Sequence, residues 1–470
     1  MYHLRSSVTL ICLLVICSGI ITSFIDPVSK AKSKAPNIIF ILTDDQRWDA
    51  LGYAGNNIIH TPHLDQLARE GLYFKNAFAT TPICAASRAT LFTGLYERTH
   101  DYTFGKLPLS NAYMMESYPY LLKKAGYQTG FVGKFGVKVN QGMEDSMFHF
   151  MKKTAWPYIK KINGQTIHLA DINGNHAINF IKENSSKPFC LSLSFWSPHA
   201  DDGAKEQYFW PSYCDSLYTN VRIPLPATAK PEFFDALPDF LKKTMNRERW
   251  YWRFDSTEKY QRMVKGYYRM ISGVDSVIGR IRAALDDQGI ADNTIIVFLG
   301  DNGYFLGDRG YADKWLMYEQ SIRVPMIIYD PRQPASRRRR TIDDYVLNVD
   351  VTPTILQLAN VSIPKRYQGV SLTGFINGKP DKWRTSIFCE HRLEGNPTLL
   401  KTECFRDKQW KFIRYEDHPD FFELYNLKDD PDETKNLALD KKYDRMLTMY
   451  RTKCDSIARD LLSARVSPLH

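Results

Sequence analysis

The sequence lacks the features that would place it outside the globular proteins. It has no internal repeat and no nucleic-acid-binding signature, and no segment after its leader is apolar enough to cross a bilayer. Hydrophobic residues make up 44% of its 470 residues and aromatic residues 13%, so the chain is neither disordered nor fibrous and can bury a large core. The net charge is +10, but much of it is local, in Arg337 to Arg340. A solvated surface loop explains this run as well as a glycosaminoglycan contact or a processing site does. We expect no nucleic-acid partner.

Residues 1–25 are expected to be a signal peptide. Arg5 precedes the apolar run VTLICLLVICSGIITSF, the arrangement of a secretory leader. The run is also near the minimum length of a membrane span, so an uncleaved anchor stays open. Export predicts a periplasmic, lysosomal or extracellular protein. Two of the eight cysteines lie in this leader; if Cys84 is chemically special, an odd number remains and their pairing stays open.

Beyond the leader, strand-like and helix-like segments alternate. Apolar runs typical of buried strands occur in NIIFILT, PFCLSLSFW and NTIIVFLG, and the longest amphipathic pattern covers residues 259–290. Alternation of this kind predicts an α/β fold, with a large, mostly parallel sheet flanked by helices. From about residue 384, short strand-like runs and a terminal helix predict a smaller antiparallel sheet. Residues 205–260 are aromatic and weakly periodic, which indicates a long excursion beside the site.

Polar residues follow two of these strands. Asp44 and Asp45 come after one, and Asp301 and Asn302 come after another. Since open α/β sheets bind ligands at the carboxyl ends of their strands, we expect these four side chains to share a site. Oxygen ligands without histidine or thiolate favour a hard cation, calcium or magnesium, over zinc. The alternative for each pair taken singly is that it caps the next helix.

Cationic residues occur at similar positions. Arg88 lies four residues after Cys84, Lys134 follows a strand, His199 ends FWSPH, and Lys314 follows the second acidic pair. Each alone could be a surface residue. A metal and several fixed cations in one crevice suit an oxyanion ester, a sulfate or a phosphate, and a helix beginning near Ser87 would add its amide groups.

Four segments in order resemble motifs of the formylglycine-dependent sulfatases of the alkaline-phosphatase-like superfamily. They are PNIIFILTDDQR, PICAASRATLFTG, TIIVFLGDNGYFLGDRGYADKW and LYNLKDDPDETKNLA. The resemblance implies an alkaline-phosphatase-like fold, with a catalytic domain over 36–383 and a small subdomain over 384–470. It also implies that a maturation enzyme oxidises Cys84 to formylglycine, the nucleophile toward sulfur. By the same resemblance Asp44, Asp45, Asp301, Asn302 and the modified Cys84 hold calcium, in preference to magnesium. Arg88 steadies the modified side chain, Lys134 and Lys314 grip the sulfate, and His199 protonates the leaving alcohol.

The chain departs from this family at two positions. Ala86 stands where the commonest signature has proline, and Gly136 stands where the family's usual Gly-Lys-Trp-His block has the histidine that helps expel sulfate. We consider His100 as its substitute or as a substrate contact; a structural histidine is the alternative. His391, within Glu390-His391-Arg392, is a second candidate substrate contact, and a surface loop explains it equally well.

The sequence thus predicts an exported sulfatase acting on sulfate esters of a carbohydrate or glycan. Aromatic residues within 208–260 could line a carbohydrate cleft or pack in the core. Two alternatives stay open: a phosphodiester or phosphonate monoester hydrolase on the same scaffold, and a sulfatase-like glycan-binding protein without turnover. The sequence leaves the oligomeric state undetermined.

Overall fold

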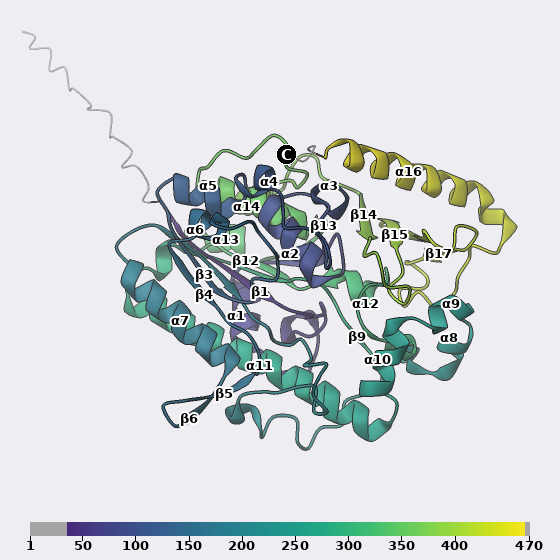
Figure 1. The fold of residues 1–470 in the computed structure, drawn as a ribbon, viewed down its shortest axis with the longest axis horizontal. Helices are drawn as coiled ribbons and strands as arrows, with labels where there is room; N and C mark the ends of the chain where they lie inside the picture. The colour runs from purple at the N-terminus through teal and green to yellow at the C-terminus, as the bar shows by residue number, and fades with distance from the viewer. Residues whose placement is uncertain (1–34, 466–470) are drawn as a thin grey trace, which may run out of the picture. The chain divides into compact units, whose positions relative to one another are not determined.

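The computed structural model describes residues 35–465, in which helices cover both faces of a central sheet (Figure 1). The predicted signal peptide lies outside the described residues. Within 35–465, no helix has the length and hydropathy that crossing a membrane requires.

The central sheet has nine strands, most of them parallel. In spatial order these are β11 (Arg323–Val324), β2 (Leu72–Phe78), β12 (Met326–Tyr329), β8 (Thr294–Gly300), β1 (Asn37–Thr43), β7 (Phe189–Ser194), β3 (Gln128–Gly133) and β4 (Phe150–Lys153), with β13 (Arg340–Leu347) also pairing β2. Strands β8, β1, β7, β3 and β4 run parallel, and β12 is antiparallel to β8 and β2. The expected mostly parallel sheet is therefore confirmed. Its central strands are buried on both faces, as the continuous apolar run of β1 predicted.

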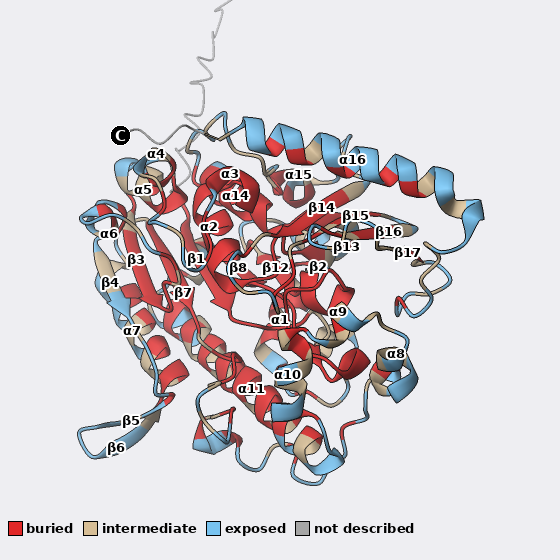
Figure 2. Ribbon diagram, turned by 45° about the vertical axis from the view of Figure 1, so that its right-hand side comes forward, coloured by how far each residue is buried: buried red, intermediate tan, exposed pale blue. Residues whose placement is uncertain are grey.

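Alternate residues of β1 face two hydrophobic layers. Ile38, Phe40 and Leu42 pack in one cluster with α2 (Cys84–Thr93), α5 (Tyr118–Lys124), α14 (Val351–Leu358) and α15 (Thr373–Asn377). Ile39 and Ile41 pack in the other with α1 (Pro62–Glu70), α7 (Leu169–Asn184) and α11 (Thr257–Asp287). The buried residues of both layers follow the inner faces of the helices (Figure 2). This sandwich positions the sheet's carboxyl edge.

A four-stranded antiparallel sheet follows at the C-terminus, as expected. Its strands are β14 (Ser386–His391), β15 (Thr402–Asp407), β16 (Trp410–Tyr415) and β17 (Phe422–Asn426), and α16 (Asp444–Ser463) packs on it. A shared cluster containing Phe78, Tyr345 and Ile413 joins this sheet to the central one. Residues of the two predicted domains thus share one core, and the boundary at 383/384 stays a prediction.

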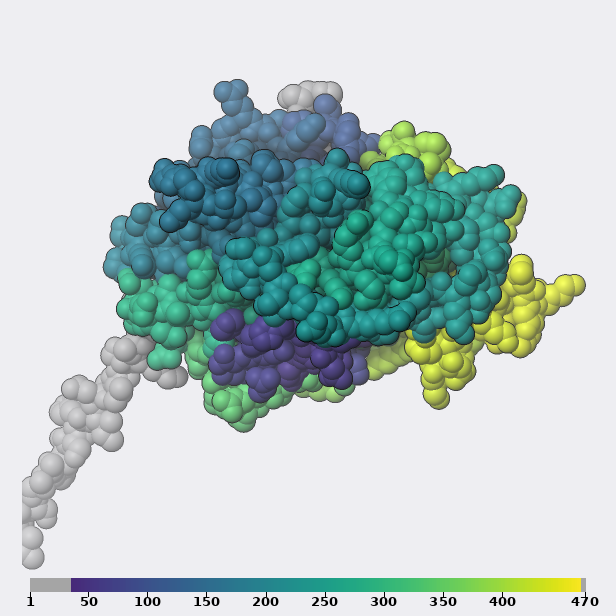
Figure 3. Space-filling view, turned by 90° about the horizontal axis from the view of Figure 1, so that it is seen from below, coloured from purple at the N-terminus to yellow at the C-terminus, as the bar shows by residue number. Residues whose placement is uncertain are grey.

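The remaining elements are short. Two-stranded ribbons are formed by β5 (Ile159–Ile162) with β6 (Gln165–His168) and by β9 (Phe305–Leu306) with β10 (Ala312–Asp313). The short α-helices are α3 (Glu97–His100), α4 (Asn111–Met114), α6 (Met143–Met147), α8 (Pro231–Asp235), α9 (Asp239–Lys242), α10 (Met245–Arg253), α12 (Glu319–Ile322) and α13 (Ala335–Arg338). The 3₁₀ turns are η1 (Gly52–Ala54), η2 (Ser212–Cys214), η3 (Ala227–Ala229), η4 (Ala291–Asn293), η5 (Asp308–Gly310), η6 (Asn348–Asp350) and η7 (Lys441–Tyr443). The excursion over 205–260 includes η2, η3 and α8–α10, and its teal surface covers much of one face (Figure 3).

Candidate active site

The four oxygen-bearing residues predicted to share a site do lie together. Thr43 pairs with Gly300 in the register of β1 and β8, so the residues that follow the two strands are neighbours. The backbone N–H of Asp45 donates to Oδ1 of Asp301 (3.1 Å), and Nδ2 of Asn302 donates to Oδ1 of Asp45 (2.7 Å). Asp44, Asp45, Asp301 and Asn302 are all fully buried. Parallel alignment of the strands thus creates this cluster.

Cys84 is the first residue of α2 and is buried beside this cluster. Burial raises the pKa of its thiol, and the opposing charges of Lys134 and Lys314 do not cancel that effect. Arg88, one turn along α2, donates from Nε to Oδ2 of Asp301 (3.0 Å), and its Nη2 lies 2.9 Å from the same oxygen as an ion pair. The beginning of α2 is thereby tied to the end of β8.

Two lysines neutralise the aspartates. Lys134, directly after β3, pairs with Oδ2 of Asp44, and Nζ of Lys314 lies 2.5 and 2.6 Å from the two carboxylate oxygens of Asp45. Burial alone would lower the pKa of each lysine, but the adjacent carboxylates outweigh it and raise both. Both lysines are therefore held charged although they are buried.

His199 lies on the loop after β7 and faces the same carboxylates. Its Nδ1 is 2.6 Å from the carbonyl oxygen of Ala200, which only accepts, so Nδ1 carries the hydrogen. Its Nε2 is 3.6 Å from Oδ2 of Asp45. Burial lowers the pKa of His199 despite the attraction of Asp45. Near neutral pH the ring is therefore uncharged, and its Nε2 is the nitrogen that can take a proton when a further negative charge comes close.

The donor set fits a hard divalent cation. Within residues 35–465, Oδ1 of Asp44 and Oδ1 of Asn302 are buried oxygens without a hydrogen-bond partner, which is costly unless something else contacts them. Asp44, Asp45 and His199 each offer a ligand atom within 4.8 Å of one another. Burial and the charge of Asp44 raise the pKa of Asp301 to about 7, whereas Lys134 and Arg88 help to outweigh burial and hold the pKa of Asp44 well below its usual range. A bound cation would relieve this crowding of carboxylates.

Several residues of the site were not singled out from the sequence. Ser194 Oγ accepts from Nη1 of Arg88 (2.5 Å), and Ser87 Oγ donates to the carbonyl of Asp301 (2.6 Å). The Trp196 ring lies 4.6 Å from Nζ of Lys134, and the Trp156 ring lies 4.8 Å from the Trp196 ring and 5.7 Å from that of His199. Trp196 lies three residues before His199 on the same loop after β7, so its place near the site could have been predicted from the sequence. Trp156 gave no such signal.

The two remaining candidate histidines are buried away from solvent. His100 accepts from the N–H of Tyr102 at Nδ1 (3.1 Å) and contacts Thr90 Oγ1 through Nε2 (3.2 Å), and burial lowers its pKa to about 3. His391, at the end of β14, donates from Nδ1 to the carbonyl of Leu400 (2.9 Å), while its Nε2 has no partner among the described residues. These contacts account for His100 as part of the fold. A substrate role for either residue stays a prediction.

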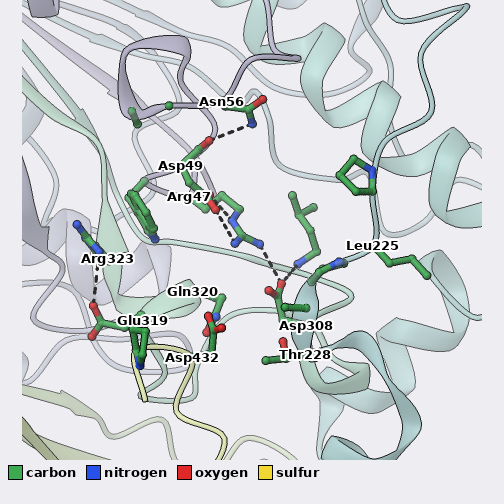
Figure 4. Close-up of a pocket in the computed structure, with 18 of the residues that line it drawn as sticks. Arg47, Asp49, Asn56, Leu225, Thr228, Asp308, Glu319, Gln320, Arg323 and Asp432 are labelled. Carbon is green, nitrogen blue, oxygen red and sulfur yellow. Dashed lines mark hydrogen bonds and ion pairs between the residues drawn. The ribbon is translucent and has the colours of Figure 1, made fainter. Parts of the chain in front are cut away.

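A cavity of about 750 Å³ adjoins the loop that follows the two aspartates (Figure 4). None of the predicted site residues lines it. Arg47 reaches from that loop to Asp49 and, at 2.9 Å, to Asp308, and Arg323 lies 3.9 Å from Glu319. Since Arg47, Arg323 and Arg406 already pair with carboxylates of this lining, we do not assign a second catalytic centre to the cavity.

The chain resembles known proteins along most of its length. Residues 36–361 match the family model described as sulfatase, and residues 307–460 match a model described as the C-terminal part of N-sulphoglucosamine sulphohydrolase. The chain is 28% identical over 476 residues to an N-acetylglucosamine-6-O-sulfatase of Bacteroides thetaiotaomicron, covering 87% of this chain and 83% of the relative. It is 28% identical to an arylsulfatase of Clostridium perfringens, covering 88% and 93%.

Solved structures agree on the fold. One, described as a complex with its substrate D-glucosamine-2-N,6-O-disulfate, has a TM-score of 0.77 and 25% identity, with 91% of this chain and 98% of that chain covered. A phosphonate monoester hydrolase of Agrobacterium radiobacter has a TM-score of 0.76 at 21% identity, covering 91% and 96%, which shows the shared scaffold alone.

Proposed function

Because the chain belongs to the sulfatase family and is a sulfuric ester hydrolase, we propose that it cleaves sulfated carbohydrates through a formylglycine made from Cys84. One observation carries this proposal. Cys84 opens α2 within a buried set of three carboxylates and three cations, and the charges of Lys134, Asp44 and Lys314 all act on it. A cysteine required only for packing would not need charged neighbours.

Different residues of the site bind the sulfate group and hold the start of α2 in place. Lys134 and Lys314 are charged, buried and paired to different aspartates, so their ammonium groups can hold sulfate oxygens on two sides. Arg88 holds Asp301 and the carbonyl of Lys134 (2.8 Å), which fixes the start of α2 against the strand ends. A divalent cation held by Asp44, Asp45, Asp301 and Asn302 would add positive charge at the sulfate, and formylglycine would supply the nucleophilic hydroxyl. We propose calcium in preference to magnesium.

His199 is the proton donor in this proposal. The hydrogen at its Nδ1 is committed to the carbonyl of Ala200, so its Nε2 is the atom that exchanges a proton with substrate. Burial keeps the free ring neutral, and an incoming sulfate ester, with its negative charge, favours the protonated form. The protonated Nε2 can then pass its hydrogen to the oxygen of the leaving alcohol.

A carbohydrate is the substrate class that the surroundings favour. Trp156 is 39% exposed beside His199, so an apolar ring face lies where the leaving alcohol would be. Two relatives are named for sulfated sugars or glycans, the glucosamine sulfatase and an ulvan-active sulfatase of Formosa agariphila. We also propose that the enzyme is exported through its predicted leader. A formylglycine-generating enzyme would be the partner that oxidises Cys84.

The first test is the mass of the tryptic peptide of residues 76–88, made in a host that matures sulfatases. We expect the aldehyde at Cys84, together with sulfate release from aryl and sugar sulfates, and neither in Cys84→Ala. An unmodified thiol beside a converted control sulfatase would overturn the formylglycine step. Faster cleavage of a phosphodiester than of a sulfate ester, measured in parallel, would overturn the choice of substrate.

A further inference from the structure

A second large groove lies outside the site described above. It has a volume of about 730 Å³, within the range of small-molecule binding sites. Three parts of the chain form most of its walls: the β5–β6 ribbon, the first turns of α7, and residues 205–215 of the long excursion, which lie against α11. None of the proposed site residues lines it.

The wall formed by residues 208–211 is built against α11 by close packing. A Cβ atom at Gly266 would lie 2.8 Å from Cβ of Tyr208, and a Cβ atom at Gly273 would lie 2.8 Å from Cγ of Pro211. These two glycines are seven residues apart, which places them on one side of the helix. Glycine at both positions lets the aromatic segment lie directly on α11. The groove is therefore a packed feature of the fold.

Aromatic rings and cations meet in this groove. Phe209, Trp210 and Tyr213 contribute rings, and Tyr213 is 51% exposed. Trp210 donates to Asp215 (2.7 Å), and Tyr213 donates to Asp171 (3.1 Å), so both polar tips are fixed. An exposed ring held in one orientation is suited to a flat, partly apolar ligand such as a sugar ring.

The charges of the groove leave two cations unpaired. Arg280 is paired with Asp171 at 2.7 Å. Lys205 and Arg262 also line the groove, and within residues 35–465 neither has an ion-pair or hydrogen-bond partner through its side chain. Glu206 is the one carboxylate there without such a partner. Over its whole lining the groove has three carboxylates, Asp171, Glu206 and Asp215, and three cations, so its formal charge is balanced. Lys205 and Arg262 are the cations that remain available to contact an anionic group of a ligand.

The groove shares its framework with the His199 loop. Tyr158 stacks on His168 and Phe209, and its hydroxyl donates to the carbonyl of His199 (2.6 Å). On the other side of the loop, the N–H of Asp201 donates to the carbonyl of Gln207 (2.7 Å). The segment that carries the proposed proton donor therefore continues directly into the groove wall.

We propose that this groove is an accessory site for a sulfated oligosaccharide, which rests on the sulfatase function proposed above. The exposed Tyr213 ring packs on a sugar ring, and Lys205 and Arg262 contact sulfate groups that are not being cleaved. A desulfated glycan lacks the second interaction and a small aryl sulfate reaches neither. The groove therefore contributes to the binding of glycan substrates and has no effect on the hydrolysis of small aryl sulfates.

The test compares two pairs of cations. Lys205→Ala/Arg262→Ala removes the unpaired cations of the groove, and Tyr213→Ala removes the ring. The matched control is Lys365→Ala/Arg445→Ala, which removes the same charge from exposed side chains that likewise have no partner within 35–465 and do not line the groove. We expect the groove variants to raise KM for a heparin or chondroitin sulfate hexasaccharide about 3- to 10-fold at low salt, and less at high salt. Hydrolysis of an aryl sulfate stays unchanged in all variants.

A binding measurement separates this proposal from the sulfatase function. Calorimetric titration of Cys84→Ala with the same hexasaccharides should show weaker binding when Lys205 and Arg262 are also replaced, and weaker binding of the desulfated forms. Equal affinity with and without the groove cations would overturn the proposal, as would an equal loss in the Lys365/Arg445 control. Failure of the wild-type enzyme to release sulfate would instead refute the function, while the titration would still report on the groove.

Discussion

A Cβ atom at position 136 would lie 2.5 Å from Cδ of Arg88. Gly136 also has a φ of +74°, a conformation that other residues adopt at a cost of about 1–2 kcal/mol. The space that a side chain at position 136 would need, where the resemblance to the sulfatases leads one to expect a histidine, is filled by the aliphatic part of Arg88. Restoring the histidine alone would displace that arginine.

We therefore predict that Gly136→His and Gly136→Ala lower both thermal stability and sulfate release. The matched control is Gly142→Ala, where φ is +79° but no atom lies within 4 Å of a Cβ, so only the backbone strain is added. Melting temperature and kcat on an aryl sulfate measure the two effects. A Gly136→His enzyme faster than the wild type would show that Arg88 can move aside.

Chelation should abolish activity and leave the fold intact. Asp44, Asp45 and Asp301 are already paired with Lys134, Lys314 and Arg88, so the buried carboxylates are not left unpaired without the cation. We expect EDTA to remove sulfate release, calcium to restore it better than magnesium, and the melting temperature to fall only modestly.

Asn302→Ala tests the proposed ligand set directly. The variant removes a buried oxygen that has no hydrogen-bond partner within residues 35–465, and it should raise the calcium concentration for half-maximal activity about tenfold or more. Replacement of Asn293, an amide at the far end of β8, is the control. An unchanged calcium requirement in Asn302→Ala would remove Asn302 from the site.

Trp156→Ala should weaken the binding of sugar substrates and leave the binding of other sulfate esters unchanged. Covering roughly 50 Å² of apolar sugar surface by a ring is worth about 1.3 kcal/mol, or about tenfold in KM. An acyclic alkyl sulfate, which cannot stack, should be cleaved as well as by the wild type, and Trp156→Phe should recover most of the loss. Equal losses on both substrates would instead indicate that Trp156 supports the neighbouring ring of His199.

Acid should destabilise the protein through buried histidines. Burial lowers the pKa of His100 to about 3 and those of His168 and His391 to about 4. The unfolded chain takes up these protons near pH 6.5 whereas the folded one does not, so stability falls as the pH drops from about 6.5 toward 4. Each group contributes up to about 1.4 kcal/mol per pH unit in that window.

His100→Gln isolates one of these contributions. Its absolute stability will be lower, because the two hydrogen bonds of the ring are altered. The informative quantity is the slope of unfolding free energy against pH between 6.5 and 4.5, which should be shallower than in the wild type. An identical slope would mean that His100 is protonated in the folded state.

Local patterns were sufficient for much of the fold. The apolar run of β1 and the amphipathic period of α11 are properties of neighbouring residues, and both elements form where expected. Strand β2, directly after Gly71, and the β5–β6 ribbon were not predicted, because short segments depend on their partners for stability. The excursion at 205–260 was expected as irregular chain, and its short helices form against α11 and the β9–β10 ribbon.

By itself, the sequence determined the chemistry that the site can perform. Cys84, the strand-end carboxylates and the cations are specified by residue type and by position at the ends of buried strands, which parallel pairing must bring to one edge. Tertiary structure alone decided which lysine neutralises which aspartate, that Arg88 fills the space beside Gly136, and that His100 is committed to the fold. It also built the groove from segments more than a hundred residues apart. The reason is physical: hydrogen bonds, ion pairs and steric contacts between distant segments are set by packing, which no local pattern encodes.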